Sequence, residues 1–371
     1  MKKVLVIMFA VLLAVGLVAC SSTPGSASNA ASNAAPASSK AAEAAGSPSS
    51  DSVESVASAA ATAQAGQAKK DLTFVIVPKC VHEWFDAVTY GANQEATALS
   101  QQLGVNVKID YRAPATADIT TQNTVLEQAA ATNPDGIILD PNDYSGSKQI
   151  IDEIQAKGIP VMLFDARVPG SGLCAVGNDF TEQATLEAED LVKRLGEKGK
   201  IAIMHGVPTA ANHSERYETL KTVLAKYPNI EVIEAGADQD NYQTAQQLAA
   251  ACIAANPDLG GFLCVDASGP IGISAAIEEA GMQGKITFVG AENLLQILQY
   301  VKNGTMVCSY STKPQDQGSL AVLMLFQATM GMDIPQFVDT GILYIDSSNV
   351  DEWISIAEAS KNANASSSAA S

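Results

Sequence analysis

Basic residues are scarce in this chain of 371 residues, which has 22 Lys and Arg against 40 Asp and Glu and a formal net charge of −18. Nucleic acids and anionic lipid surfaces attract clustered Lys and Arg, so this balance argues against both as partners. The chain also lacks GxGxxG after its first strand-like segment, a GxxxxGK phosphate loop, a GxSxG elbow and HExxH. These absences exclude the usual phosphate-binding loops, and none of the common catalytic motifs remains. We therefore expect neither an enzyme nor a resident cofactor or metal.

A second long apolar run is also missing. The one long apolar run in the chain, residues 4–13, follows Lys2 and Lys3. It is short for a membrane span, which needs about 20 residues. It leads to Leu17-Val18-Ala19-Cys20, the pattern of a lipobox, in which the cysteine thiol accepts a lipid before cleavage. We predict a signal peptide over residues 1–20 and lipidation of Cys20. The alternative is an ordinary signal peptide that happens to contain a cysteine.

Aromatic residues are absent between the lipobox and residue 70, where Ala, Ser, Asn, Gly, Pro, Gln and Thr prevail. Such a segment cannot bury enough apolar surface to offset the entropy of ordering it, so residues 21–70 are predicted to be a disordered tether. The same composition predicts a disordered tail over residues 360–371. The folded part then lies between about residues 71 and 359, which is long enough for two ordinary domains.

Cysteine is infrequent, and no CxxC pair occurs. Apart from Cys20, there are five cysteines, an odd number, and too few nearby histidines for a zinc pattern. We interpret the five mainly as small buried apolar residues, while one disulfide, which the sequence does not assign, stays open.

Strand-like and helix-like segments alternate along the folded part. In its first half, β-branched apolar runs at 72–77, 105–111, 136–139 and 160–164 are separated by helical spacing at 85–103, 119–131 and 148–157. This alternation predicts βαβ units, hence a parallel sheet with helices on both faces.

The second half repeats the scheme. The expected strands are 200–204, 230–235, 261–265, 286–289 and 305–310, with helices at 215–226, 242–255, 271–280 and 294–301. A further helix at 318–329 and a late strand at 342–345 indicate that the chain crosses between the two halves more than once. The predicted fold class is α/β, with two Rossmann-like lobes.

Several short segments carry a resemblance to a known family. The run Phe74-Val75-Ile76-Val77-Pro78-Lys79 followed by Trp84-Phe85, then Asn133-Pro134-Asp135-Gly136, Gly158-Ile159-Pro160-Val161 and Val176-Gly177-Asn178-Asp179, resembles the ribose-type periplasmic binding proteins of sugar ABC transporters. The match continues to Val289-Gly290-Ala291-Glu292 and covers essentially the whole folded region. The Pro78-Lys79 pair is more like the autoinducer-2 and rhamnose-binding members.

The resemblance implies two lobes, joined by three hinge crossings near residues 174–180, 309–314 and 337–343, that close on a ligand by a hinge motion. It places residues 71–175 and 313–339 in an N-terminal lobe. Residues 176–312 and 340–359 then form a C-terminal lobe.

Polar and aromatic residues at the ends of the expected strands are the candidates for ligand binding, because the carboxyl ends of parallel strands display side chains to ligands. Aromatic faces cover the C–H side of a sugar, while charged and amide groups bond to its hydroxyls. With the resemblance, these rules select Lys79, Trp84, Phe85, Asp140, Asp165, Arg167, Asn212, His213, Asp266, Glu292 and Thr312. The alternatives are core packing for the aromatics, helix capping for Asn212 and Asp165, and a surface role for Lys79.

The resulting hypothesis is an extracytoplasmic binding protein, anchored to the cell membrane by a lipid on Cys20, that captures a sugar or polyol and delivers it to an ABC permease. We expect a monomer. The alternative is a receptor that presents autoinducer-2 or a sugar to a sensor protein, and neighbouring permease or histidine kinase genes would separate the two.

Overall fold

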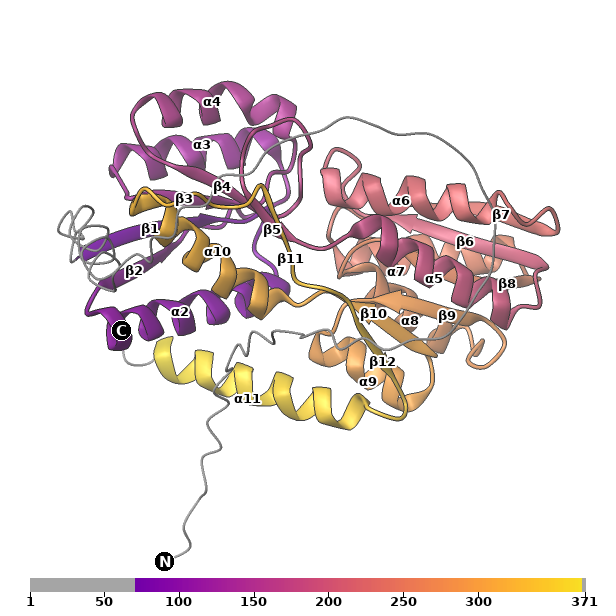
Figure 1. The fold of residues 1–371 in the computed structure, drawn as a ribbon. Helices are drawn as coiled ribbons and strands as arrows, with labels where there is room; N and C mark the ends of the chain where they lie inside the picture. Colours follow the sequence, from indigo (N-terminus) through magenta and orange to yellow (C-terminus); the bar gives the residue numbers. More distant parts are fainter. Residues whose placement is uncertain (1–70, 369–371) are drawn as a thin grey trace, which may run out of the picture. The chain divides into compact units, whose positions relative to one another are not determined.

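The computed structural model describes residues 71–368, which form two six-stranded sheets (Figure 1). All neighbouring strands of the first sheet are parallel. Its order is β11 (Phe337–Asp339), β5 (Ala175–Gly177), β4 (Val161–Asp165), β3 (Gly136–Leu139), β1 (Asp71–Val77) and β2 (Asn106–Tyr111). The second sheet is parallel except for its last strand, β12, which runs antiparallel to β10. Its order is β12 (Leu343–Asp346), β10 (Cys308–Ser311), β9 (Thr287–Ala291), β8 (Leu259–Cys264), β6 (Gly199–His205) and β7 (Ile230–Ala237).

Helices cover both faces of the first sheet, and we call this sheet with its helices the first lobe. They are α2 (Glu83–Leu103), α3 (Ile119–Ala131), α4 (Tyr144–Ala156) and α10 (Pro314–Thr329). Strand β1 explains the layering, because successive side chains of a strand point to opposite faces. Phe74 and Ile76 pack with residues of α2 and α10, whereas Val75 and Val77 pack with residues of α3 and α4. All four are buried, as expected for a central parallel strand.

The second lobe, defined as the second sheet with its helices, repeats this arrangement. Its helices are α5 (Phe180–Arg194), α6 (Ala211–Leu224), α7 (Tyr242–Ala255), α8 (Gly269–Glu279), α9 (Leu295–Asn303) and α11 (Val350–Ser368). On β6, Ile201 and Ile203 pack toward α5 and α6, while Ala202 and Met204 pack toward α7 and α8. The predicted α/β class with two parallel sheets is confirmed.

The chain passes between the sheets three times within the described residues. The short connections are residues 178–179, 312–313 and 340–342, each of which lies inside a predicted crossing. The sequence placed residue 176 at the start of the second lobe, but β5 pairs with β4 and β11 in the first sheet. The lobe limits otherwise stay a prediction.

The sequence missed helix α5 and misjudged the chain's end. The buried positions of α5, among them Ala184, Ala188 and Leu191, recur at helical spacing, so the sequence did contain the signal for this helix. A disordered tail was predicted from residue 360, whereas α11 continues to Ser368 because no Gly or Pro interrupts it. The predicted signal peptide, Cys20 and the tether 21–70 lie outside the described residues.

The five other cysteines are buried and free, as their interpretation as small core residues predicted. No disulfide joins them. Among residues 71–368, no helix is both long and apolar enough to cross a membrane.

Two glycines allow α2 and α10 to approach closely. A methyl group on Gly318 of α10 would overlap the backbone oxygen of Val88 on α2, and one on Gly91 would overlap that of Gln315. Backbone atoms cannot move aside as the end of a side chain can. The position of α10, which follows the crossing at residues 312–313, therefore depends on glycine at both places.

We expect Gly318→Ala to lower the free energy of unfolding by about 1–3 kcal/mol, the usual cost of overpacking. Gly146→Ala on α4 is the matched control, since its methyl group would meet only the movable ends of the Ile119 and Asp143 side chains, and alanine favours a helix by about 1 kcal/mol. Urea denaturation measures both. Equal stability of the two variants would contradict the proposed close approach.

Candidate functional site

The carboxyl ends of strands from both sheets converge on one small hollow. Strand β1 leads to Lys79, β4 ends in Asp165, β8 leads to Asp266 and β9 to Glu292. These residues line the hollow with residues from the starts of α2 and α6, and the lining also includes several residues not predicted. The full lining is Lys79, His82, Trp84, Phe85, Asp165, His213, Arg216, Asp240, Asp266, Ala267 and Glu292.

Lys79 occupies the centre of this arrangement. Its ammonium lies 3.3 Å from Oδ2 of Asp140 and 3.5 Å from Oδ2 of Asp165, and all three side chains are almost completely buried. Burial by itself lowers the pKa of Lys79, but the carboxylates of Asp140, Asp240 and Asp165 outweigh it, so the net pKa is raised. Burial raises the pKa of Asp140 and Lys79 opposes this rise. Lys79 is therefore a buried cation held by carboxylates, which removes the surface alternative.

Asp165 and Asn212 join the two lobes beside this lysine. The Asn212 amide donates from Nδ2 to Oδ2 of Asp165, and both side chains are buried. Oδ1 of Asp165 and Oδ1 of Asn212 have no hydrogen-bond partner. Asp165 has φ of +56°, a left-handed conformation that Asp and Asn tolerate better than most residues. The pair thus offers two buried acceptor oxygens, and the Asn212 side chain does not cap α6.

Trp84 connects the first lobe to Glu292 of the second lobe. Its indole Nε1 donates to Oε2 of Glu292 at 2.9 Å and lies 3.3 Å from Oγ1 of Thr312. Thr312, in the second crossing, donates its hydroxyl to the same Glu292 oxygen. Phe85 meets Trp84 edge to face with ring centroids 5.2 Å apart. Both aromatics line the hollow, but they also pack in the core, so packing and ligand contact are compatible here.

A buried arginine supports Glu292 from behind. Arg216 donates from Nη1 to the Val265 carbonyl at 2.8 Å and from Nη2 to Oε1 of Glu292 at 3.3 Å. Its guanidinium lies 4.1 Å from the centroid of Phe180, and the residue is only 2% exposed. Burial raises the pKa of Glu292, and Arg216 opposes that rise.

Acidic groups dominate the wall formed by the second lobe. Asp266 accepts the backbone N–H groups of Ser268 and Gly269 at the start of α8. Burial, then the carboxylate of Asp240, raise the pKa of Asp266 to about 7. Asp238 is completely buried, and its burial raises its pKa well above the usual range. Among the described residues, no group of three or more His, Cys, Asp or Glu is arranged to hold a metal ion.

The sequence did not identify Asp238, Asp240, His82 or Arg216 as members of the site. Asp238 and Asp240 follow β7 directly, so the rule that selected Asp165 and Asp266 applied to them as well. The expected strand ended at residue 235, and the two aspartates fell in an unassigned stretch before α7. Arg216 was not selected, because it lies within a helix and not at a strand end.

Arg167 is the one selected residue that neither lines the hollow nor pairs with a residue that lines it. It forms an ion pair with Glu215 of the second lobe at 3.5 Å and lies over the ring of Phe337, 4.7 Å from its centroid. One third of its side chain is exposed. Ala166 is completely buried instead, so the arginine comes one position too late in the chain to turn inward. Asp140, Asn212 and Thr312 do not line the hollow but contact residues that do.

The hollow is small. Its volume is about 20 Å³, room for about one water molecule. His82 of the first lobe also contacts Ser268 of the second, with Nε2 and Oγ 3.2 Å apart. Thr209 donates to the Asn142 carbonyl at 3.0 Å. Since contacts across the lobes close the space, any ligand larger than water must separate them.

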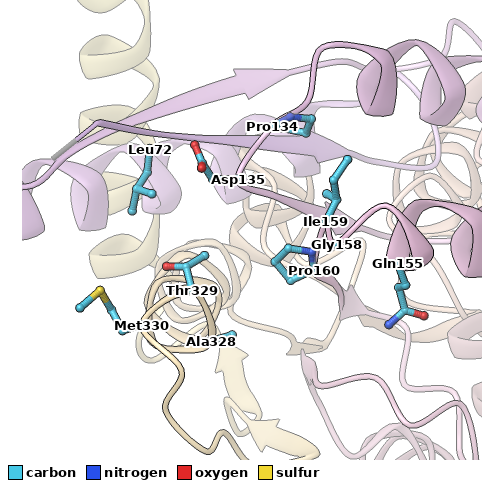
Figure 2. A pocket seen from close by; sticks show the side chains of 10 residues that line it. All are labelled: Leu72, Pro134, Asp135, Gln155, Gly158, Ile159, Pro160, Ala328, Thr329 and Met330. Carbon is cyan, nitrogen blue, oxygen red and sulfur yellow. The ribbon is translucent and has the colours of Figure 1, made fainter. Parts of the chain in front are cut away.

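A larger hollow of about 560 Å³ lies elsewhere in the first lobe (Figure 2). It is lined at the amino-terminal ends of β1, β3 and β4 and at the end of α10, so it faces away from the strand ends that carry the site. Asp135 is the one charged residue in its lining, and its Oδ2 accepts the backbone N–H of Thr73 at 2.8 Å. Without converging polar groups, this hollow is the weaker candidate despite its size.

Comparison with known proteins gives a consistent result. Residues 72–332 match the model of one family, described as a periplasmic binding protein domain. A D-apiose import binding protein of Actinobacillus succinogenes is 24% identical over 76% of this chain and 90% of its own length. A xylose/arabinose-binding protein of Sulfolobus acidocaldarius is also 24% identical, but the match spans only 63% of that protein.

Two solved structures share the fold. A solute-binding protein of an ABC transporter from Burkholderia graminis, in complex with D-arabinose, superposes with a TM-score of 0.71 and 26% identity, covering 76% of this chain and 96% of the other. A glucose-galactose binding protein from Geobacillus stearothermophilus gives a TM-score of 0.69 and 25% identity, covering 76% and 99%. These relatives are binding proteins and not enzymes, as the absence of catalytic motifs predicted.

Proposed function

The chain belongs to the family of periplasmic binding proteins, and we propose that it captures a small sugar or polyol between its two lobes and delivers it to an ABC permease. The family resemblance seen in the sequence is confirmed, while the likeness of the Pro78-Lys79 loop to autoinducer-2-binding members stays a prediction. We further propose that the protein is an extracytoplasmic monomer, anchored to the cell membrane by a lipid on Cys20.

The supporting observation is the mixture of buried donors and unpaired acceptors in the hollow. Oδ1 of Asp165 and Oδ2 of Asp240 have no hydrogen-bond partner, and both side chains are at least nine-tenths buried. A buried polar atom without a partner costs about 1–3 kcal/mol, so a ligand that supplies donors is stabilised there. A hydroxyl group both donates and accepts, and several hydroxyls on one small ring satisfy such a site.

The aromatic residues supply the apolar part of the proposed contact. Trp84 and Phe85 lie side by side at the start of α2 and line the hollow. Aromatic faces cover the C–H groups of a sugar ring. A sugar acid is disfavoured, because Asp165, Asp240 and Asp266 would repel its carboxylate.

We expect the melting temperature of the purified protein to rise with a pentose, a hexose or a polyol, and not with a sugar acid. A ligand at 100 times its Kd adds about 2.7 kcal/mol to stability. The panel should contain ribose, allose, xylose, arabinose, xylitol, myo-inositol and autoinducer-2, with glucuronate as the anionic control. The proposal is contradicted if only the anion shifts the transition, or if no compound in the panel does.

Tryptophan fluorescence gives an independent readout in the same experiment. The chain has two tryptophans, Trp84 in the hollow and Trp353 on α11. In a Trp353→Phe variant, the remaining emission reports on the hollow alone. A compound that raises the melting temperature without changing this emission binds elsewhere.

A further inference from the structure

The hydrogen bonds of His213 fix the position of its proton. Nδ1 accepts the backbone N–H of Val207 at 2.8 Å, so this nitrogen carries no hydrogen. The neutral imidazole then carries its hydrogen on Nε2 and can only donate from that atom. Gly206 makes this possible, since a methyl group there would lie 2.5 Å from Nδ1.

The Nε2 atom faces another donor. It lies 3.2 Å from Nζ of Lys79, whose ammonium has three donors and no acceptor. Its other neighbour, Oδ1 of Asp240, is 4.0 Å away, beyond hydrogen-bonding distance. Two donors therefore meet across the lobes, at the centre of a site that is otherwise rich in acceptors.

A change in the protonation state of Lys79 or of His213 would replace the contact between two donors with another unfavourable arrangement. A neutral Lys79 could accept from His213, but Asp140 and Asp165 at 3.3 and 3.5 Å would then lose their counter-ion. A doubly protonated His213 would place a second cation against Lys79 and would still face Val207 with a donor. Burial, followed by Lys79 and Arg216, also lowers the pKa of His213 well below its usual range.

We propose that Lys79 and His213 hold one oxygen atom of the ligand between them, and that their opposed donors hinder closure of the lobes when that oxygen is absent. This inference rests on the proposed function and specifies the ligand further. The bridging oxygen accepts from both lobes at once. Oδ1 of Asp165 and Oδ2 of Asp240 accept hydrogens from further hydroxyls of the same ligand, so the ligand is a polyol.

The first test needs no ligand. Nitrogen-15 NMR of the imidazole rings reports which nitrogen carries the proton, and the chain has only three histidines. Variants His82→Gln and His205→Gln assign the other two and leave His213 unchanged. We expect His213 to be neutral with its proton on Nε2. A proton on Nδ1 would overturn the inference, whatever the ligand is.

The second test measures binding and closure with D-ribose, D-xylose and D-allose as probes. For His213→Phe, which removes the donor, we expect Kd to rise about 10- to 100-fold. For His213→Gln, whose amide oxygen can accept from Lys79, we expect the ligand-free protein to show the smaller radius of gyration of the sugar-bound wild type in X-ray scattering. The control is His205→Gln, because His205 stacks on Tyr217 outside the hollow.

The outcomes separate the inference from the proposed function. If the wild type binds neither these sugars nor any other compound of the thermal-shift panel, the proposed function fails, and the NMR result still decides whether two donors face each other. If the wild type binds a sugar and His213→Phe binds it equally well, the inference fails alone. An unchanged scattering profile for His213→Gln would contradict the hindrance to closure.

Discussion

Replacing Arg216 by methionine is expected to lower the free energy of unfolding by about 3–5 kcal/mol, the cost of removing one partner of a buried ion pair. Methionine retains apolar contact with Phe180 but supplies no donor. Glu292 would lose its cation, and the Val265 carbonyl would lose the donor at 2.8 Å. Gln183, whose Oε1 accepts from Nε of Arg216 at 3.2 Å, would lose a partner as well.

The chain contains a matched control in Arg167. Both arginines lie over a phenylalanine ring and pair with a glutamate, but Arg167 is one third exposed whereas Arg216 is buried. We expect Arg167→Met to change stability by no more than about 1 kcal/mol, as is usual for exposed pairs. Thermal and urea unfolding measure both variants. If Arg216→Met and Arg167→Met lost similar amounts of unfolding free energy, burial of the ion pair would not determine the effect of removing its arginine.

The effect of Arg216→Met should also depend on pH. Burial raises the pKa of Glu292 even with Arg216 present, so removing the arginine raises that pKa further. At a pH low enough to protonate this carboxyl group in both the folded and the unfolded state, its raised folded-state pKa does not lower the free energy of unfolding. As the pH rises, the unfolded state loses the proton first, and the free energy of unfolding falls. The deficit of the variant is therefore expected to be smaller in mildly acidic buffer than in mildly alkaline buffer.

The elements of the fold could be predicted from the sequence wherever apolar residues form a distinct run or recur at helical spacing. Strands β1 and β3 and helices α3 and α7 lie within a residue of their predicted limits, because the strands are continuous apolar runs and the buried positions of the helices recur at helical spacing. Strands β5 and β11, with three residues each, are too short to show a period. β5 pairs with β4 before the first crossing, whereas β11 reaches β5 only after the second crossing has returned the chain to the first sheet.

The site was predictable where it depends on strand ends. Lys79, Asp165, Asp266 and Glu292 follow or end parallel strands, and the structure brings all of them to one hollow. Pairing across the lobes was not predictable, because it depends on how two sheets far apart in the sequence face each other. The contact between Asp165 and Asn212 is of this kind.

Asp165→Asn is expected to raise the Kd for the bound sugar about 10- to 100-fold, because a charged hydrogen bond contributes about 1.5–3 kcal/mol. Asparagine keeps the shape of the side chain and tolerates the φ of +56°, whereas alanine would add backbone strain. Lys79 would keep Asp140 as a counter-ion at 3.3 Å. The ligand-free melting temperature should therefore change little.

The loss is measurable in the thermal-shift experiment. At a sugar concentration of 100 times the wild-type Kd, a 100-fold weaker variant gains only about 0.4 kcal/mol, in place of about 2.7 kcal/mol. Asp143→Asn is the control, because Asp143 caps α4 through Ser145 and Gly146, and asparagine caps equally well. If Asp165→Asn retains the full shift, its unpaired Oδ1 does not receive a ligand hydroxyl. The acceptors facing the sugar would then have to be sought on the second lobe, at Asp240 and Asp266.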